Sequence, residues 1–174
     1  MHKEIYTFTE LENQLRAFIL EVNTYSQYYS NAFLLLYLTG CRPLEIFDAQ
    51  RWSIFEDEYV LLQPAKGNNI RVLPFNLFPP GYVTSIYSSK IQSSYLSRST
   101  LERYFYKYFY ARPTFIYDSE NFNPIGLYLF RHFRMKEKYN ELGNVEAVSD
   151  FFGEVDHKNT ASYIFSQLYY TAPD

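Results

Sequence analysis

The chain of 174 residues contains one cysteine, Cys41, and only three histidines. A single cysteine cannot close an internal disulfide, and so few thiol and imidazole ligands argue against a metal site. The longest apolar run, residues 32–38, is too short to span a bilayer. Residues 1–4 do not open a signal peptide. We therefore expect a soluble cytoplasmic protein that needs no metal and no cofactor.

Positive charge is also scarce, since 16 Lys and Arg residues stand against 19 Asp and Glu residues and the net charge is −3. A protein that coats nucleic acid is usually basic, so any such contact here must depend on locally concentrated cations. Aromatic residues are abundant, with 19 Tyr and 16 Phe. The chain is 47% hydrophobic and 20% charged, which is typical of one globular domain over residues 1–174 with a core of rings.

Helical spacing of apolar residues extends over most of the chain. Thr7 and Glu10 form a capping-box pattern before the first helix, and Ser99 and Glu102 repeat it before another. Gly40 suits the end of the second helix. Beyond the first helix, the patterns predict helices over about 26–38, 43–49, 99–110, 125–139, 145–152 and 159–170.

Two short β-type runs, 59–62 and 70–73, interrupt this helical pattern. The stretch between them is rich in turn-forming residues, which predicts a hairpin with Lys66 at or near its tip. The expected fold class is therefore mainly α with a small antiparallel β-sheet (α+β).

Two arginines stand in unusual surroundings. Arg42 follows the helix-ending Gly40 by two residues and precedes Pro43, so it projects from a fixed turn; a surface arginine beside a helix cap is the alternative. Arg131 shares a helix face with Tyr128 and His132 at positions i, i+3 and i+4. An arginine among Phe and Leu residues is costly to bury without an anion. Arg131 therefore either pairs with a carboxylate or binds a phosphate.

Taken in order, these segments resemble the catalytic domain of tyrosine recombinases, the family of phage integrases and Xer proteins. The family's first box, T-G-x-R-x-x-E, corresponds to residues 39–45, Thr-Gly-Cys-Arg-Pro-Leu-Glu. Its hairpin lysine corresponds to Lys66, and its H-x-L-R-H box to residues 128–132, Tyr-Leu-Phe-Arg-His. Its L-G-H segment corresponds to residues 152–154, Phe-Gly-Glu, and the nucleophilic tyrosine nine residues later to Tyr163.

The resemblance implies a site-specific DNA recombinase or integrase that cleaves and rejoins DNA through a 3′-phosphotyrosine intermediate. Tyr163 is then the nucleophile, and the guanidinium groups of Arg42 and Arg131 hold the nonbridging phosphate oxygens. Lys66 protonates the 5′-oxygen of the leaving group, and His132 is an auxiliary proton carrier. This transesterification needs no metal, because the two arginines stabilise the charge.

Two positions depart from the family pattern, and one part of the family's protein is missing. Tyr128 stands where the family usually has His, and Glu154 where it usually has His or Trp. We expect Tyr128 to hydrogen-bond a phosphate oxygen or Tyr163. We expect Glu154 to support an arginine and lower activity; a solvated surface carboxylate is the alternative. The family's N-terminal DNA-clamping domain is absent from residues 1–174.

The partners implied are double-stranded DNA and, on that DNA, further copies of the chain in a tetramer associated with the nucleoid. Candidates for contact with DNA phosphates are Arg71, Arg98, Arg103, Arg134 and Lys136, although the last two also fit a solvated helix face. Two alternatives stay open. One is a catalytically impaired DNA-binding or regulatory relative of the same fold, and the other is an unrelated α-rich interaction module.

Overall fold

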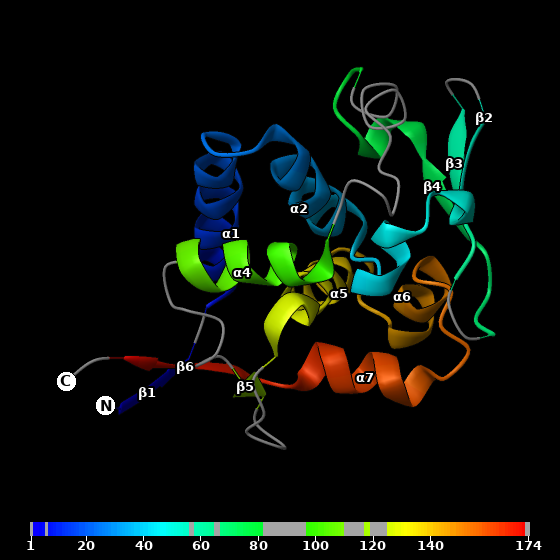
Figure 1. Cartoon of the computed structure of the whole chain (residues 1–174). Helices are drawn as coiled ribbons and strands as arrows, with labels where there is room; N and C mark the ends of the chain where they lie inside the picture. The colour runs from blue at the N-terminus through cyan, green and yellow to red at the C-terminus, as the bar shows by residue number, and fades with distance from the viewer. Residues whose placement is uncertain are drawn as a thin grey trace.

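The computed structural model describes residues 2–5, 7–55, 58–64, 67–81, 97–109, 117–118 and 125–172. Its mainly helical architecture, with small antiparallel sheets at the periphery, confirms the predicted fold class (Figure 1). Helix α5 (Leu129–Leu142) lies in the middle and contacts helices on several sides: α1 (Phe8–Asn23), α2 (Gln27–Thr39), α6 (Val145–Phe151) and α7 (His157–Phe165). Helix α4 (Arg98–Tyr108) packs against α1. None of the described helices is long and apolar enough to cross a membrane.

The first two helices form where local sequence patterns predict them. The hydroxyl of Thr7 accepts from the backbone N–H of Glu10, whose carboxylate accepts in return from the N–H of Thr7, so the capping box is complete. Helix α2 ends at Gly40, whose φ of 62° is the left-handed conformation that glycine adopts without strain. Pro43 then opens the short 3-10 helix η1 (Pro43–Phe47), where a longer helix over 43–49 was predicted. A second short turn, η2 (Ala49–Arg51), follows it.

A three-stranded antiparallel sheet of β2 (Trp52–Phe55), β3 (Tyr59–Leu62) and β4 (Arg71–Pro74) follows, in the order β2-β3-β4. Pairing of Leu62 with Arg71 confirms the predicted hairpin, and strand β2 extends it. The short turn η3 (Phe75–Leu77) comes after β4. Lys66 lies outside the described residues, so its place on the hairpin stays a prediction.

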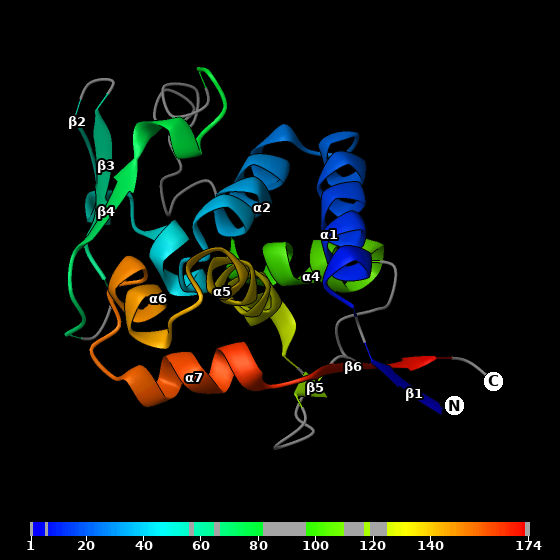
Figure 2. The ribbon, with the colours of Figure 1, turned by 180° about the vertical axis from the view of Figure 1, so that it is seen from behind.

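A second sheet was not predicted. Strand β6 (Leu168–Ala172) pairs with β1 (His2–Ile5) on one side and β5 (Tyr117–Asp118) on the other. Figure 2 shows β1 and β6 side by side, which brings the two ends of the chain together. The predicted helix over 159–170 is therefore wrong at its end, because α7 stops at Phe165. Leu168 continues the helical spacing from Ile164, but pairing across the length of the chain overrides that local pattern.

Two helix starts also differ from the prediction. Helix α4 is capped by Ser97, whose hydroxyl accepts from the N–H of Thr100, and not by Ser99. Helix α7 begins two residues before the predicted Asn159, because the carboxylate of Asp156 accepts from the N–H of Lys158 and caps it there. The predicted helix over 125–139 is confirmed as the turn η5 (Gly126–Tyr128) continued by α5.

Aromatic rings fill the main core, as the composition predicts. Phe18, Phe33, Phe105 and Phe130 meet there from four different helices, with ring centroids 4.6 to 6.5 Å apart. A smaller apolar cluster of Met135, Val148, Phe152 and Ile164 joins α5, α6 and α7. The candidate site lies beside this second cluster.

Candidate active site

Arg42 is held by the turn that follows α2. The backbone N–H of Arg42 donates to Oε1 of Glu45 at 2.7 Å, and Nη1 of Arg42 lies 3.8 Å from Oε2 of the same carboxylate. Glu45 is buried, and its carbonyl accepts from the indole N–H of Trp52. The T-G-x-R-x-x-E spacing therefore has a structural reason, since the final Glu fixes the backbone from which Arg42 projects.

Three guanidinium groups bind the carbonyls at the C-terminal end of α2. Arg134 donates to the carbonyl of Tyr37, Arg71 to that of Thr39 at 2.7 Å, and Arg131 to that of Gly40 at 2.8 Å. These carbonyls have no partner within the helix and form the negative end of its dipole. Helix α2 has no basic residue in its own last turn, so cations from β4 and α5 neutralise it.

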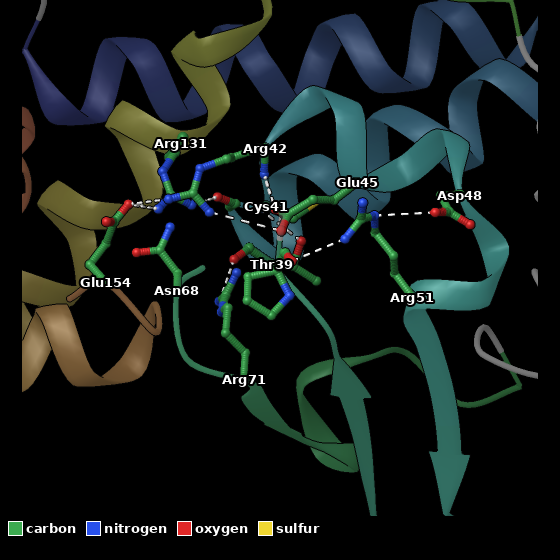
Figure 3. Close-up of polar contacts among 12 residues, drawn as sticks. Thr39, Cys41, Arg42, Glu45, Asp48, Arg51, Asn68, Arg71, Arg131 and Glu154 are labelled. Atoms are coloured by element: carbon green, nitrogen blue, oxygen red, sulfur yellow. Dashed lines mark hydrogen bonds and ion pairs between the residues drawn. The ribbon is translucent and has the colours of Figure 1, made fainter. Parts of the chain in front are cut away.

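Arg42 and Arg131 converge on one anion, the carboxylate of Glu154 (Figure 3). Nη2 of each arginine lies 2.5 Å from the same oxygen, Oε1 of Glu154. The side chains of Arg131 and Glu154 are 1% and 4% exposed, while that of Arg42 is 14% exposed. Glu154 is therefore not a solvated surface residue, and the pair of arginines forms a buried anion-binding site with one edge open to solvent.

Tyr163 lies beside this site, on α7. Its ring lies 5.7 Å from the guanidinium carbon of Arg131. Burial raises the pKa of the Tyr163 phenol above its usual value, and the charge of Glu154 adds to this, while Arg131 and Arg42 act in the opposite direction. The phenol is therefore protonated at neutral pH and close enough to both arginines for their charges to influence its ionisation.

Tyr128 and His132 border Tyr163 from α5 and the turn before it. The imidazole of His132 meets the Tyr163 ring edge-on, with centroids 4.5 Å apart. Tyr128 is half-buried and close enough for its phenol to raise the pKa of Tyr163. The structure thus brings together Arg42, Arg131, Glu154, Tyr163, Tyr128 and His132, all from the sequence-based set.

The candidates for DNA contact divide into two groups. Arg103 is exposed, and Arg98 pairs with Glu102 on the surface of α4. Arg71 and Arg134 are only 2% and 6% exposed. Since their guanidinium groups bind main-chain carbonyls, the expected surface role does not fit either residue.

Lys136 is also turned toward the protein. Its ammonium donates to the carbonyls of Ile164, at 2.8 Å, and Ser166, just after α7. Burial lowers the pKa of Lys136 to about 8. Its expected contact with DNA therefore does not fit this arrangement either, because the Lys136 ammonium already donates to these two carbonyls.

The sequence did not predict that Arg71 has a structural role. Its guanidinium stacks 4.7 Å from the centre of the Phe152 ring and donates to the carbonyl of Phe151 at 3.2 Å, so it joins β4 to α6. Burial and the nearby charge of Arg131 lower the pKa of Arg71 to about 9. In the sequence, Arg71 is a cation near the start of a predicted strand, just after the polar residues of the hairpin turn. That pattern does not predict burial.

Sequence reasoning also missed Asn68 and Asn69, on the return of the hairpin. The N–H of Asn69 donates to the carbonyl of Gly153 at 2.8 Å. The side-chain oxygen of Asn68 accepts from the N–H of Val155 at 3.3 Å. The hairpin is thus fastened to the turn that carries Glu154.

Among the described residues, no group of three or more His, Cys, Asp and Glu side chains is placed to hold a metal ion. The anion of this site, the carboxylate of Glu154, is bound by Arg42 and Arg131.

Comparison with known proteins supports the fold. No protein-family model matches the chain, and no curated protein matches its sequence. The structure is similar to that of XerH, a site-specific recombinase solved in a post-cleavage complex with a palindromic difH substrate, with a TM-score of 0.58 and 13% identity. The match covers 87% of this chain and 47% of that one, so the chain spans about half the length of XerH. At this identity the likeness concerns the fold, which resembles a tyrosine recombinase catalytic domain.

Proposed function

We propose that residues 1–174 form the catalytic domain of a site-specific DNA recombinase or integrase that acts through a 3′-phosphotyrosine intermediate. The observation that carries the proposal is the convergence of Arg42 and Arg131 on one anion beside the phenol of Tyr163. Similarity to the fold of a DNA-bound recombinase supports it. An enzyme of this kind acts on double-stranded DNA, assembles on it as a tetramer, and is found with the nucleoid.

The proposed reaction is a transesterification. The Tyr163 oxygen attacks the scissile phosphorus, a tyrosyl–phosphate bond forms, and the bond from phosphorus to the 5′-oxygen breaks. The two guanidinium groups each donate to a nonbridging oxygen as charge builds on it, and donors of this kind contribute about 3–4 kcal/mol each to transition-state stabilisation. No metal is required for that stabilisation.

The proton transfers are assigned to neighbouring side chains. A phenol must lose its proton as it attacks, and His132, in contact with the Tyr163 ring, is the candidate acceptor. Lys66 is the candidate donor to the 5′-oxygen, on the basis of its place in the sequence. Tyr128 lies near Tyr163 and is the candidate hydrogen-bond donor to a phosphate oxygen.

Formation of a covalent adduct tests the proposal. Duplexes that bind the protein are first selected from a random library, and a nick is then introduced near the bound site so that cleavage releases a short strand and traps the intermediate. Wild-type protein should form a covalent complex that survives a denaturing gel. Tyr163→Phe should form none.

Tyr139→Phe is the matched control for this experiment. Tyr139 and Tyr163 both pack on the same small apolar cluster, but the Tyr139 ring contacts Phe165. This variant should form the adduct as the wild type does. An adduct that persists in Tyr163→Phe would contradict the proposal.

One observation favours a second function, that of a DNA-binding relative that does not cleave. Glu154 occupies both arginines, and a carboxylate beside a scissile phosphate repels it. Tight binding of the selected duplex without any adduct, in wild type and in Glu154 variants alike, would support this second function over the first.

A further inference from the structure

The two arginines hold the carboxylate of Glu154 as they would hold a bound anion. Both Nη2 atoms point at one position, which Oε1 of Glu154 fills (Figure 3). The Nη1 atoms of the two arginines are directed elsewhere: Nη1 of Arg131 donates to the carbonyl of Gly40, and Nη1 of Arg42 faces Glu45. A nonbridging phosphate oxygen held by both guanidinium groups would need the position that Oε1 takes.

We propose that Glu154 is a built-in occupant of this anion site, which a DNA phosphate must displace before Tyr163 can attack. This inference rests on the proposed function, because it names the phosphodiester as the competing ligand. It makes Glu154 a residue that sets access to the site, in addition to one that supports the arginines.

The charges of the site make displacement feasible. The guanidinium groups of Arg42 and Arg131 face two carboxylates, those of Glu154 and Glu45, so these four groups together are close to neutral when Glu154 is in place. The buried guanidinium of Arg71 binds the carbonyl of Thr39, next to the Gly40 carbonyl that Arg131 binds, and this third cation gives the cluster a net positive charge. The 14% exposure of Arg42 provides the side from which a phosphate can approach.

The backbone around Glu154 holds its carboxylate in the site. The N–H of Glu154 donates to the carbonyl of Ser149 at 2.9 Å. Gly153 has a φ of 67°, and a Cβ there would lie 2.4 Å from the carbonyl oxygen of Asn69. Only glycine therefore allows the hairpin return to approach the turn this closely.

This fastening links two parts of the site. The contacts of Asn69 with Gly153 and of Asn68 with Val155 join the turn of Glu154 to the strand return two to three residues after Lys66. A movement of the turn that carries Glu154 would therefore also displace Asn68 and Asn69 on the hairpin return.

A phosphate titration tests the proposal without DNA. The probe is inorganic phosphate at pH 8, with affinity measured by calorimetry and by the rise in melting temperature. Glu154→Gln keeps the size of the side chain and removes its charge, so it should bind phosphate at least about tenfold more tightly than the wild type. Glu154→His is the second variant, because imidazole is mostly neutral at pH 8.

Glu137→Gln is the matched control. It removes a carboxylate from another buried guanidinium, that of Arg134 on α5, and should leave phosphate affinity unchanged. Equal phosphate affinity in the wild type and both Glu154 variants would overturn the proposal. Failure of both variants to fold at any phosphate concentration would also overturn it, because phosphate would then be unable to replace the carboxylate.

The same variants separate this inference from the proposed function. With the selected nicked duplex, Glu154→Gln should form the adduct faster than the wild type. Tighter phosphate binding by the Glu154 variants without any adduct would support the proposal that Glu154 occupies the anion site and contradict the recombinase function. An adduct together with unchanged phosphate affinity would support the recombinase function and contradict the proposed role of Glu154.

Discussion

Arg131 binds a main-chain carbonyl and a carboxylate with different nitrogens of one side chain. Nη1 holds Gly40 at the end of α2, and Nη2 holds Glu154 after α6. A planar guanidinium can make both contacts at once, because its donors diverge in a fixed fork. The residue therefore stabilises the fold and forms the anion site with the same group.

Replacement of Arg131 by Lys should weaken both functions. One ammonium cannot reproduce the fork, so a buried carboxylate or carbonyl loses its partner, and the free energy of unfolding should fall by about 3–5 kcal/mol. Formation of the DNA adduct should fall by about 10²–10³-fold. Urea unfolding and the adduct gel measure the two effects.

Arg98→Lys is the control for that substitution. Arg98 pairs with Glu102 on the exposed side of α4, and surface pairs of this kind contribute roughly 1 kcal/mol or less. An equal loss of stability in both variants would contradict the assignment of Arg131.

Lys136 gives the stability of the protein a specific dependence on pH. Burial lowers the pKa of Lys136 to about 8 in the folded protein. Its pKa in the unfolded chain is about 10.4. The charged form is thus disfavoured by folding at neutral pH, and this cost disappears as pH rises through the interval between the two values.

The wild type should therefore gain stability relative to Lys136→Met as pH rises from 7 to 10, by about 1–2 kcal/mol after allowance for partial exposure. Urea unfolding at several pH values measures the difference. Lys138→Met is the control, because the Lys138 ammonium on the same helix binds the carboxylate of Glu141 and not carbonyls. A difference between the wild type and Lys136→Met that stays flat or decreases with pH would contradict this account.

At the scale of elements, the end of α2 organises the site. Gly40 lets the chain leave the helix, and Arg42 follows two residues later on the turn fixed by Glu45. There is no room for a side chain at Gly40, since a Cβ would lie 2.8 Å from Cε1 of Phe152 and 2.9 Å from Cβ of Arg134. Close packing of α2 against α5 and α6 is thus a condition for the convergence of the arginines.

Gly40→Ala should consequently destabilise the protein more than a comparable change elsewhere. Gly143 ends α5 in the same left-handed conformation, but a Cβ there would meet nothing within 4 Å. Gly143→Ala should cost about 1 kcal/mol for the backbone conformation alone. Gly40→Ala should cost about 3 kcal/mol or more, because overpacking is added. Thermal unfolding of the two variants gives the comparison, and equal losses would show that the packing around Gly40 yields.

The elements that could be predicted from the sequence are those with local causes. The capping box at Thr7, the left-handed Gly40 and the hairpin between Leu62 and Arg71 all depend on neighbouring residues. The sheet of β1, β5 and β6 could not be predicted, because its strands meet only through pairing between residues 2–5 and 168–172.

The candidate site likewise has a part that could be predicted from the sequence and a part that could not. The order of the motifs predicted that Arg42 and Arg131 would lie near Tyr163, and the structure places them so. The inward direction of Arg71 and Arg134 could not be predicted, because it depends on the carbonyls that α2 presents to them after folding.

At the scale of the whole molecule, the chain is acidic while its site is cationic. The net charge of −3 means that long-range attraction to DNA is weak. The proposed binding to DNA must therefore depend on a few local cations, among which Arg98 and Arg103 are on the surface of α4. We expect a phosphate of the target duplex to bind the site more tightly than inorganic phosphate does, because the rest of the duplex supplies further contacts.

Under the proposed function, Tyr163 forms a covalent bond to DNA phosphate beside Arg42 and Arg131. The most direct measurement is mass spectrometry of the trapped complex after cleavage of the protein at Lys and Arg. The peptide 159–174 contains Tyr163 together with Tyr169 and Tyr170, so fragmentation has to assign the modified residue. We expect a nucleotide linked to Tyr163. A nucleotide on any other tyrosine, or tightly bound DNA with no linked peptide, would contradict it.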